Sequence, residues 1–184
     1  MLKTLKPSTY EDYARLPDDK RYELIWGEIL EAPSPDAEHQ EFLGELYSII
    51  LAYVKRLQLG RVFLAPFDVV LDEHNTVQPD IVFVSKAREK IITRNNIQGA
   101  PDLVIEITSP GTGDCDRLVK KKLYEEHGVP EFWLADREAK AVTVFALSRG
   151  RYGVHGVFGE RDTLTSRALR GLKVDLAPLF RLRR

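Results

Sequence analysis

Cysteine is almost missing from this sequence, since Cys115 is the only one among 184 residues. One cysteine excludes an intramolecular disulfide and a thiolate-rich zinc site, and it is typical of proteins of the reducing cytoplasm. Long apolar runs are missing too, because no segment approaches the roughly 18 uninterrupted apolar residues of a membrane span. The first 17 residues carry no apolar signal core. We therefore expect a cytoplasmic protein that neither crosses a membrane nor is secreted.

An excess of charge of either sign is also missing. The chain has 27 Lys and Arg against 28 Asp and Glu, a formal net charge of -1. This balance excludes the strongly cationic surface of a protein that packages nucleic acid, so any surface for nucleic acid must be local. With 43% hydrophobic residues, 12 Gly and 10 Pro, collagen-like and disordered chains are excluded as well. The length predicts one globular domain covering residues 1–184.

The first half of the pattern predicts a strand and then a long helix. Apolar side chains nearly alternate over residues 21–31, with a break at Gly27 that indicates a turn or a bulge. Ser34 and Pro35 then resemble a helix N-cap and a first helical residue. Apolar residues recur every three or four positions after them until Gly60, where we expect the helix to have ended.

Beyond Gly60 the pattern is mostly that of strands. Runs at 61–71, 81–84 and 103–107 predict three of them, and the continuously apolar run 81–84 is typical of a strand covered on both faces. A second helix is predicted over 114–127, with Leu118, Val119 and Leu123 on its apolar edge. Strands are also expected at 131–135, 141–147 and 152–158, the last two as a hairpin. The order predicts an α/β or α+β domain with a mixed sheet flanked by helices.

Two acidic residues lie within apolar strands. Asp80 opens the run 81–84, and Glu106 lies inside the run 103–107. A carboxylate is costly to bury, so either a cation lies opposite it or the pKa of the carboxyl rises. If the two strands pair, both carboxylates can reach one hard divalent cation such as Mg²⁺. An ordinary ion pair with Lys or Arg, or a solvent-facing place at a sheet edge, remains open for Glu106.

A lysine on the second helix is the third candidate. Lys121 faces away from the apolar edge and is expected in solvent, whereas Lys120 flanks that edge, four residues before Tyr124. An ammonium turned toward the sheet could hold or deprotonate a water that attacks a phosphodiester. For Lys120 this position and a solvated one are both open. His39, near the start of the long helix, could approach the site in space, but it is interpreted as a capping or core residue.

Four sequence blocks carry a resemblance to a known family. The blocks are Tyr22-Glu23-Leu24, Pro79-Asp80, 101–110 (Pro-Asp-Leu-Val-Ile-Glu-Ile-Thr-Ser-Pro) and 128–133 (Gly-Val-Pro-Glu-Phe-Trp). They are similar to the PD-(D/E)XK nuclease superfamily, and within it to the small stand-alone restriction-endonuclease-like proteins long catalogued as a domain of unknown function. The likeness covers about residues 8–180 and implies a restriction-endonuclease-like core, a mixed central sheet flanked by helices with extra β-hairpins, and DNA as the substrate class.

The resemblance also implies a set of site residues. Asp80 and Glu106 would ligate Mg²⁺ or Mn²⁺, together with the carbonyl of Ile107, and a lysine would be catalytic. Thr108 stands where the superfamily motif has its lysine. In this family the lysine is thought to have moved to the following helix, where Lys120 matches best. Glu23 matches a recurrent acid of the family, as a further ligand or a supporting residue, and an exposed strand acid is the alternative.

The function expected from these residues is a magnesium-dependent endonuclease that hydrolyses DNA phosphodiester bonds, with Lys120 orienting or activating the water. The alternative is a non-catalytic DNA- or protein-binding module that has kept the nuclease fold, which the near-neutral charge and Thr108 favour. A homodimer is expected because cutting two strands needs two sites. Trp26 or Trp133 could form an exposed aromatic surface for such a contact.

Overall fold

Six strands form the main sheet of the computed structural model, which describes residues 6–17, 19–108 and 114–181, with side chains in the last range from Leu118 onward. The strand order is β11-β10-β9-β8-β6-β3. β8 and β9 run parallel, and the other neighbours in this sheet run antiparallel. The strands are β3 (Gly60–Leu64), β6 (Ile81–Ser85), β8 (Leu103–Ile107), β9 (Glu131–Asp136), β10 (Ala141–Ser148) and β11 (Arg151–Gly159).

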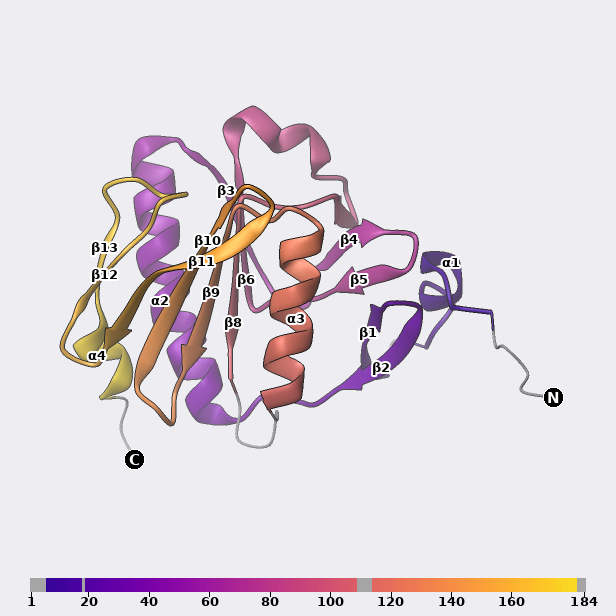
Figure 1. Cartoon of the computed structure of the whole chain (residues 1–184), viewed down its shortest axis with the longest axis horizontal. Helices are drawn as coiled ribbons and strands as arrows, with labels where there is room; N and C mark the ends of the chain where they lie inside the picture. Colours follow the sequence, from indigo (N-terminus) through magenta and orange to yellow (C-terminus); the bar gives the residue numbers. More distant parts are fainter. Residues whose placement is uncertain (1–5, 18, 109–113, 182–184) are drawn as a thin grey trace.

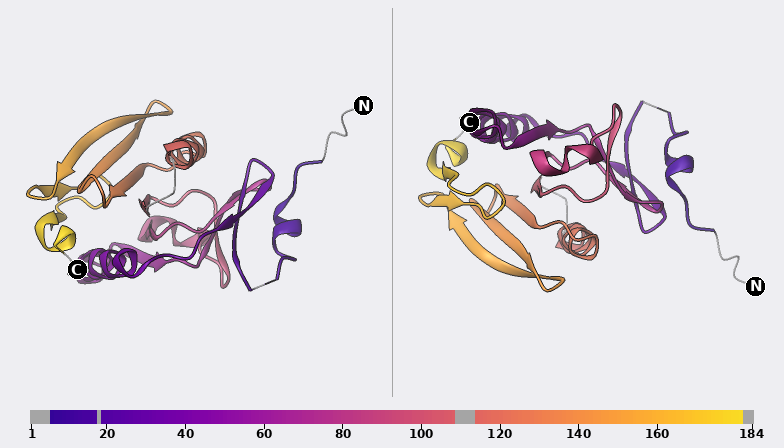
Figure 2. Two further views of the ribbon diagram at one scale, coloured as in Figure 1. Left: turned by 90° about the horizontal axis from the view of Figure 1, so that it is seen from below. Right: turned by 90° about the horizontal axis from the view of Figure 1, so that it is seen from above.

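Two helices cover opposite faces of this sheet. They are α2 (Ala37–Leu57) and α3 (Asp114–Glu126), and the views in Figures 1 and 2 show the strands between them. Because side chains alternate along a strand, β8 supplies both cores: Ile105 packs in the cluster that contains α2, and Val104 packs in the cluster that contains Leu123 of α3. Because both faces of β8 are covered, this strand needs apolar side chains on both faces.

A second sheet lies beside the first, in the order β2-β1-β5-β4-β7. Its strands are β1 (Arg21–Ile25), β2 (Glu28–Ala32), β4 (Asp68–Asp72), β5 (Asn75–Val77) and β7 (Asn96–Gln98). Figure 1 shows the β1–β2 hairpin on the right of α3. The remaining elements are α1 (Tyr10–Tyr13), the 3-10 helix η1 (Lys86–Ile91), β12 (Thr163–Thr165), β13 (Lys173–Asp175) and α4 (Leu176–Phe180).

The predicted fold class is confirmed: the molecule is an α+β domain with a mixed sheet flanked by helices and with added hairpins. Strand 103–107 and the hairpin of β10 and β11 are where the pattern predicts them. The long helix begins at Ala37, with Asp36 as its N-cap, so the N-cap prediction at Ser34 was wrong. Residues 61–71 form two strands and not one, with Ala65-Pro66 between them.

Three side-chain predictions were also wrong. Leu118 is exposed at 66% and does not lie on an apolar edge, because the buried side chains of α3 come from Leu123 and Tyr124. Trp133 is 0% exposed, so it cannot contribute to an exposed aromatic surface. Lys121 packs its ammonium 5.0 Å from the ring centroid of Phe145 and is half-buried. Among the described helices, none has the length and apolar character needed to cross a membrane.

Candidate active site

The pairing of β6 with β8 places the two predicted acids opposite each other. Ile81 pairs with Ile105 in the antiparallel register. One step beyond this pair, Asp80 lies just before β6, across from Glu106. Glu106 lies on the face that α3 covers, whereas α2 supplies His39 as a partner of Asp80. The strand pairing that the metal hypothesis requires is therefore present.

Asp80 is buried and held by two protein donors. Its Oδ1 lies 3.1 Å from Nε2 of His39, which α2 supplies, and its Oδ2 accepts a 2.7 Å hydrogen bond from the backbone N–H of Ile107. In a strand, the N–H and C=O of one residue point the same way. The carbonyl of Ile107 is therefore directed to the side of β8 on which Asp80 lies.

Two side chains of α3 form hydrogen bonds with Glu106. The Lys120 ammonium donates to its Oε1 at 3.1 Å, and the Tyr124 hydroxyl donates to the same oxygen at 2.5 Å. These two residues are four apart, and residues with that spacing lie on one face of a helix. Lys120 also donates to Oε1 of Glu23 at 2.8 Å, so its ammonium links β1 to β8.

Glu23 is buried as well, so the alternative of an exposed strand acid is wrong. Its Oε1 accepts a second hydrogen bond, from the backbone N–H of Gln78 at 3.1 Å. Gln78 lies two residues before Asp80, so the segment that leads into β6 is fixed against β1. The ion-pair alternative for Glu106 is realised in part, because Lys120 does pair with it.

Negative charge is concentrated at this place. Burial, with the nearby carboxylates of Asp80 and Glu23, raises the pKa of Glu106 to about 8 against the opposing effect of the Lys120 ammonium. Burial and the neighbouring Glu106 also raise the pKa of Tyr124 well above its usual value, so Tyr124 stays a hydrogen-bond donor. A cation that arrives among these acids would stabilise the ionised form of Glu106.

The donor atoms suit a hard divalent cation. No described residue donates a hydrogen bond to Oε2 of Glu106, and this side chain keeps 13% exposure. Within the described ranges, no three His, Cys, Asp or Glu side chains are grouped to hold a metal ion. Two carboxylates and one carbonyl remain, which suits Mg²⁺, because Mg²⁺ keeps several waters and takes few protein ligands.

An arginine outside the cluster supports its framework. Arg137 donates to both carboxylate oxygens of Asp36, at 2.9 and 2.8 Å, and to the backbone carbonyl of Thr108 at 3.1 Å. Asp36 in turn accepts a 2.6 Å bond from the N–H of His39 as the N-cap of α2. Arg137 therefore ties the residue that follows β8 to the helix end that carries His39.

The structure brings the predicted residues Glu23, Asp80, Glu106 and Lys120 together at one end of the sheet. Two further side chains of this cluster were not predicted as site residues. Tyr124 could have been found from its spacing of four from Lys120. His39 was interpreted as a capping or core residue, and no local pattern indicates that it reaches Asp80, 41 positions away. Ser109 and Pro110 of the family-like block lie outside the described residues.

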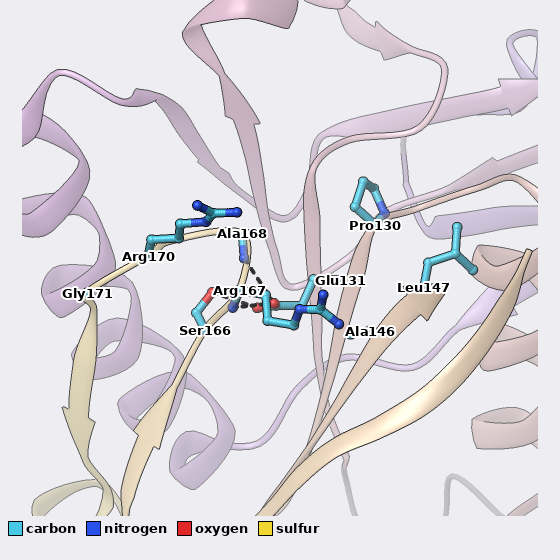
Figure 3. A pocket seen from close by; sticks show the side chains of 9 residues that line it. All are labelled: Pro130, Glu131, Ala146, Leu147, Ser166, Arg167, Ala168, Arg170 and Gly171. Carbon is cyan, nitrogen blue, oxygen red and sulfur yellow. Dashed lines mark hydrogen bonds between the residues drawn. The ribbon is translucent and has the colours of Figure 1, made fainter. Parts of the chain in front are cut away.

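Another buried acid, Glu131, lies at the other end of the sheet, since it starts β9 and pairs with Leu103 at the start of β8. It borders a cavity of about 440 Å³ (Figure 3). Its carboxylate accepts hydrogen bonds from side chains of Trp133 and Ser166 and from the N–H groups of Arg167 and Ala168. This acid is fully satisfied and holds the segment after β12 against β9.

Comparisons with known proteins agree with this fold. A family model described as "Uma2: Putative restriction endonuclease" matches residues 10–177. A crystal structure of a protein from Anabaena variabilis, described as a putative nuclease belonging to DUF820, is similar with a TM-score of 0.78 and 25% sequence identity. The likeness covers 95% of this chain and 98% of that one. No curated protein matches the chain.

Proposed function

Because the chain belongs to the Uma2 family of restriction-endonuclease-like proteins, we propose that it is a divalent-metal-dependent endonuclease that hydrolyses phosphodiester bonds of DNA. One observation carries the proposal: the Lys120 ammonium lies between Glu23 and Glu106, with Asp80 across from Glu106 on the paired strand. These are the parts that metal-assisted hydrolysis of a phosphodiester needs, since it combines carboxylate ligands with a nearby cationic donor.

Asp80, Glu106 and the carbonyl of Ile107 are the groups that would hold Mg²⁺ or Mn²⁺. When bound, the cation polarises the scissile phosphate and lowers the pKa of a water that attacks it. The hydrogen bonds of Tyr124 to Glu106 and of His39 to Asp80 fix the orientation of the two carboxylates. Partners of this kind set how well ligands are aligned.

Lys120 has a different task in this proposal. Its ammonium donates hydrogen bonds to Glu23 and Glu106, which hold it beside the proposed metal ligands. It orients the attacking water and offsets the negative charge that builds on the phosphorane. Glu23 supports it by holding the ammonium against β8.

The test is plasmid nicking by Asp80→Asn and Glu106→Gln in Mg²⁺. We expect each variant to lose cleavage by about 100-fold or more, because each removes a charged metal ligand with little change in shape. Glu138→Gln is the matched control, since Glu138 is exposed and undergoes the same chemical change. Chelation with EDTA should stop cleavage by the wild type. Cleavage that persists in both variants, with unchanged circular dichroism, rejects the assignment.

A second candidate function is a DNA-binding module without turnover. Thr108 in place of the motif lysine and the net charge of -1 favour it. Magnesium titration separates the two functions: the catalyst should nick plasmid only with metal, whereas a module should shift the mobility of DNA with little metal dependence.

The proposal includes a homodimer in the cytoplasm. Cutting both strands needs two sites, and the single cysteine suits a reducing compartment. Light scattering should therefore return about twice the chain mass of 21.0 kDa. A mass of one chain contradicts the dimer and leaves the hydrolytic site untouched.

A further inference from the structure

Trp26 is an exposed aromatic side chain in an unfavourable backbone conformation. It lies between β1 and β2, is 44% exposed and has a φ of 49°. Asn, Asp and Gly are the usual residues at this left-handed turn position, because other side chains are strained there. Because nearly half of the residue stays exposed, packing of the indole offsets only part of that strain. Strained residues that persist in a fold are concentrated at functional sites.

The surrounding chain holds this turn rigidly. The N–H of Trp26 donates to Oδ1 of Asn75 at 2.7 Å, and the N–H of Gly27 donates to the carbonyl of His74 at 2.9 Å. Ser8 donates to the carbonyl of Gly27, whose position admits no side chain because a Cβ would lie 2.4 Å from Pro7. The indole is therefore presented from a fixed backbone, which lowers the entropy lost when a ligand contacts it.

The turn lies next to the candidate active site. Glu23 lies on β1, three residues before Trp26. The ammonium of Lys122 lies 5.2 Å from the centroid of the Trp26 ring. Lys122 follows Lys120 by two residues on α3. The strand and the helix that meet at Trp26 therefore also supply Glu23 and Lys120 to the catalytic cluster.

Two more exposed apolar side chains border the same place. Leu30 is 39% exposed and pairs with Glu23 across the hairpin, so it lies on the face that Lys120 approaches. Leu118, 66% exposed, is four residues before Lys122 and shares its face of α3. We call Trp26, Leu30 and Leu118 the hairpin surface. The hairpin and the helix that carry this surface also carry Glu23 and Lys120.

We propose that Trp26 stacks on an unpaired nucleobase of the DNA substrate and so positions the strand for cleavage. The inference rests on the proposed function and adds the form in which DNA is held. A net charge of -1 gives the chain little overall attraction for a polyanion, so contacts that do not depend on charge are needed to supply binding free energy. Stacking is such a contact, and it accepts every base because every base has a flat π face.

A protein partner fits this surface less well. Stable protein interfaces bury about 800 Å² on each partner and involve about 20–30 residues a side. The hairpin surface offers three apolar residues, and the carboxylates beside it would have to be desolvated by a partner. One flat indole next to a hydrolytic cluster matches the size of a base.

The two tryptophans of the chain make a direct test possible. Trp133 is 0% exposed, so emission that a soluble quencher reaches comes from Trp26. In EDTA, where cleavage cannot occur, titration with a single-stranded oligothymidylate of about 12 nucleotides should quench the wild-type emission. A blunt duplex of the same length should quench it less, because its bases are already stacked.

Variants at Trp26 separate stacking from structure. Trp26→Asn should raise the Kd for a fluorescein-labelled oligonucleotide about 5- to 150-fold, the equivalent of about 1–3 kcal/mol, while its Tm stays equal or rises because Asn tolerates the turn. Trp26→Phe should restore part of the affinity, since it keeps an aromatic ring. Leu57→Ala, at an exposed apolar residue at the end of α2, should leave the Kd unchanged.

Each other outcome overturns the inference. Equal Kd values for the wild type and Trp26→Asn, absence of any DNA binding, or DNA binding without quenching each exclude stacking. A Trp26→Asn chain that binds DNA normally but loses dimer mass in light scattering identifies a protein interface instead. The proposed function fails on a different result, which is normal nicking by Asp80→Asn and Glu106→Gln. That result rejects hydrolysis at these two acids, and the quenching experiment with single-stranded DNA still tests Trp26 independently.

Discussion

Glu131 accepts hydrogen bonds from four donors, whereas Glu106 accepts two and lies close to two other carboxylates. Both are glutamates of the same sheet with little exposure. The oxygens of Glu131 are satisfied by its donors, whereas burial and the neighbouring carboxylates raise the pKa of Glu106. At the residue scale, this difference fits the proposed role of Glu106, because strongly shifted pKa values are concentrated at functional sites.

Glu106→Gln should therefore stabilise the metal-free protein while it removes activity. The pKa of Glu106 is raised on folding from 4.5 to about 8. Its contribution to stability is complete below the unfolded value and is lost as pH rises toward 8, because the unfolded chain ionises first. Denaturant unfolding in EDTA should show that the advantage of the glutamine variant grows between about pH 4.5 and pH 8. An advantage that is constant over this range contradicts the raised pKa.

His39→Ala should weaken cleavage without a change of fold. His39 holds Oδ1 of Asp80 at 3.1 Å, and loss of such a partner of a metal ligand typically costs about 10- to 100-fold in metal affinity or activity. The measurement is the Mg²⁺ concentration needed for half-maximal nicking, which should rise. His155→Ala, at an exposed histidine of β11, is the control and should behave as the wild type.

At the scale of elements, two hydrogen-bond networks stabilise opposite ends of the main sheet. Arg137 links the residue after β8 to the N-cap of α2, next to the candidate site. Glu131 links the start of β9 to the segment after β12, at the other end. Only the first of these borders the candidate active site, so the second can be changed separately.

Glu131→Gln should lower the free energy of unfolding by about 2–4 kcal/mol, because an amide nitrogen would face backbone N–H groups that now donate to a carboxylate. Nicking by the folded fraction should be unchanged, since Glu106 and Lys120 lie at the far end of the strands. Thermal unfolding followed by circular dichroism measures the loss. A parallel loss of activity at a temperature where the variant is folded shows instead that the two ends are coupled.

The elements themselves were predictable to different degrees. The apolar run at 103–107 predicted β8, and helical spacing of apolar residues predicted α3, because both are local patterns. β5, β7, β12 and β13 were not predicted, because strands of three residues hold too few apolar positions to show a period. The turn at Trp26 was seen only as a break at Gly27, since sequence does not show which residue takes a positive φ.

At the scale of the whole molecule, the near-zero net charge limits how much DNA affinity comes from phosphate contacts. Each neutralised phosphate adds about 0.7 to 0.9 to the slope of log K against log salt. We expect a slope of magnitude about 2–3 for single-stranded DNA between about 50 and 200 mM KCl, measured by fluorescence anisotropy. A slope of about 6–10 would reveal a basic surface that balanced charges do not suggest.

The sequence by itself determined the class of protein, the main elements and the acids that stand out within them. Asp80 and Glu106 could be found because a carboxylate inside an apolar run is costly to bury, which is a property of the run alone. For Lys120 the sequence left two positions open, one turned toward the sheet and one in solvent. Its contact with Glu23, 97 residues away, depends on how α3 packs on β8 and how β1 lies beside it.

Only the tertiary structure decided that His39 binds Asp80, that Tyr124 binds Glu106 and that Trp26 is exposed beside them. The physical reason is the distance along the chain over which each kind of interaction acts. Periodicity, capping and turn preferences act over a few residues, whereas strand register and the packing of helices bring distant groups within hydrogen-bonding distance. Burial of an acid is therefore visible in sequence, and the identity of its partner is not.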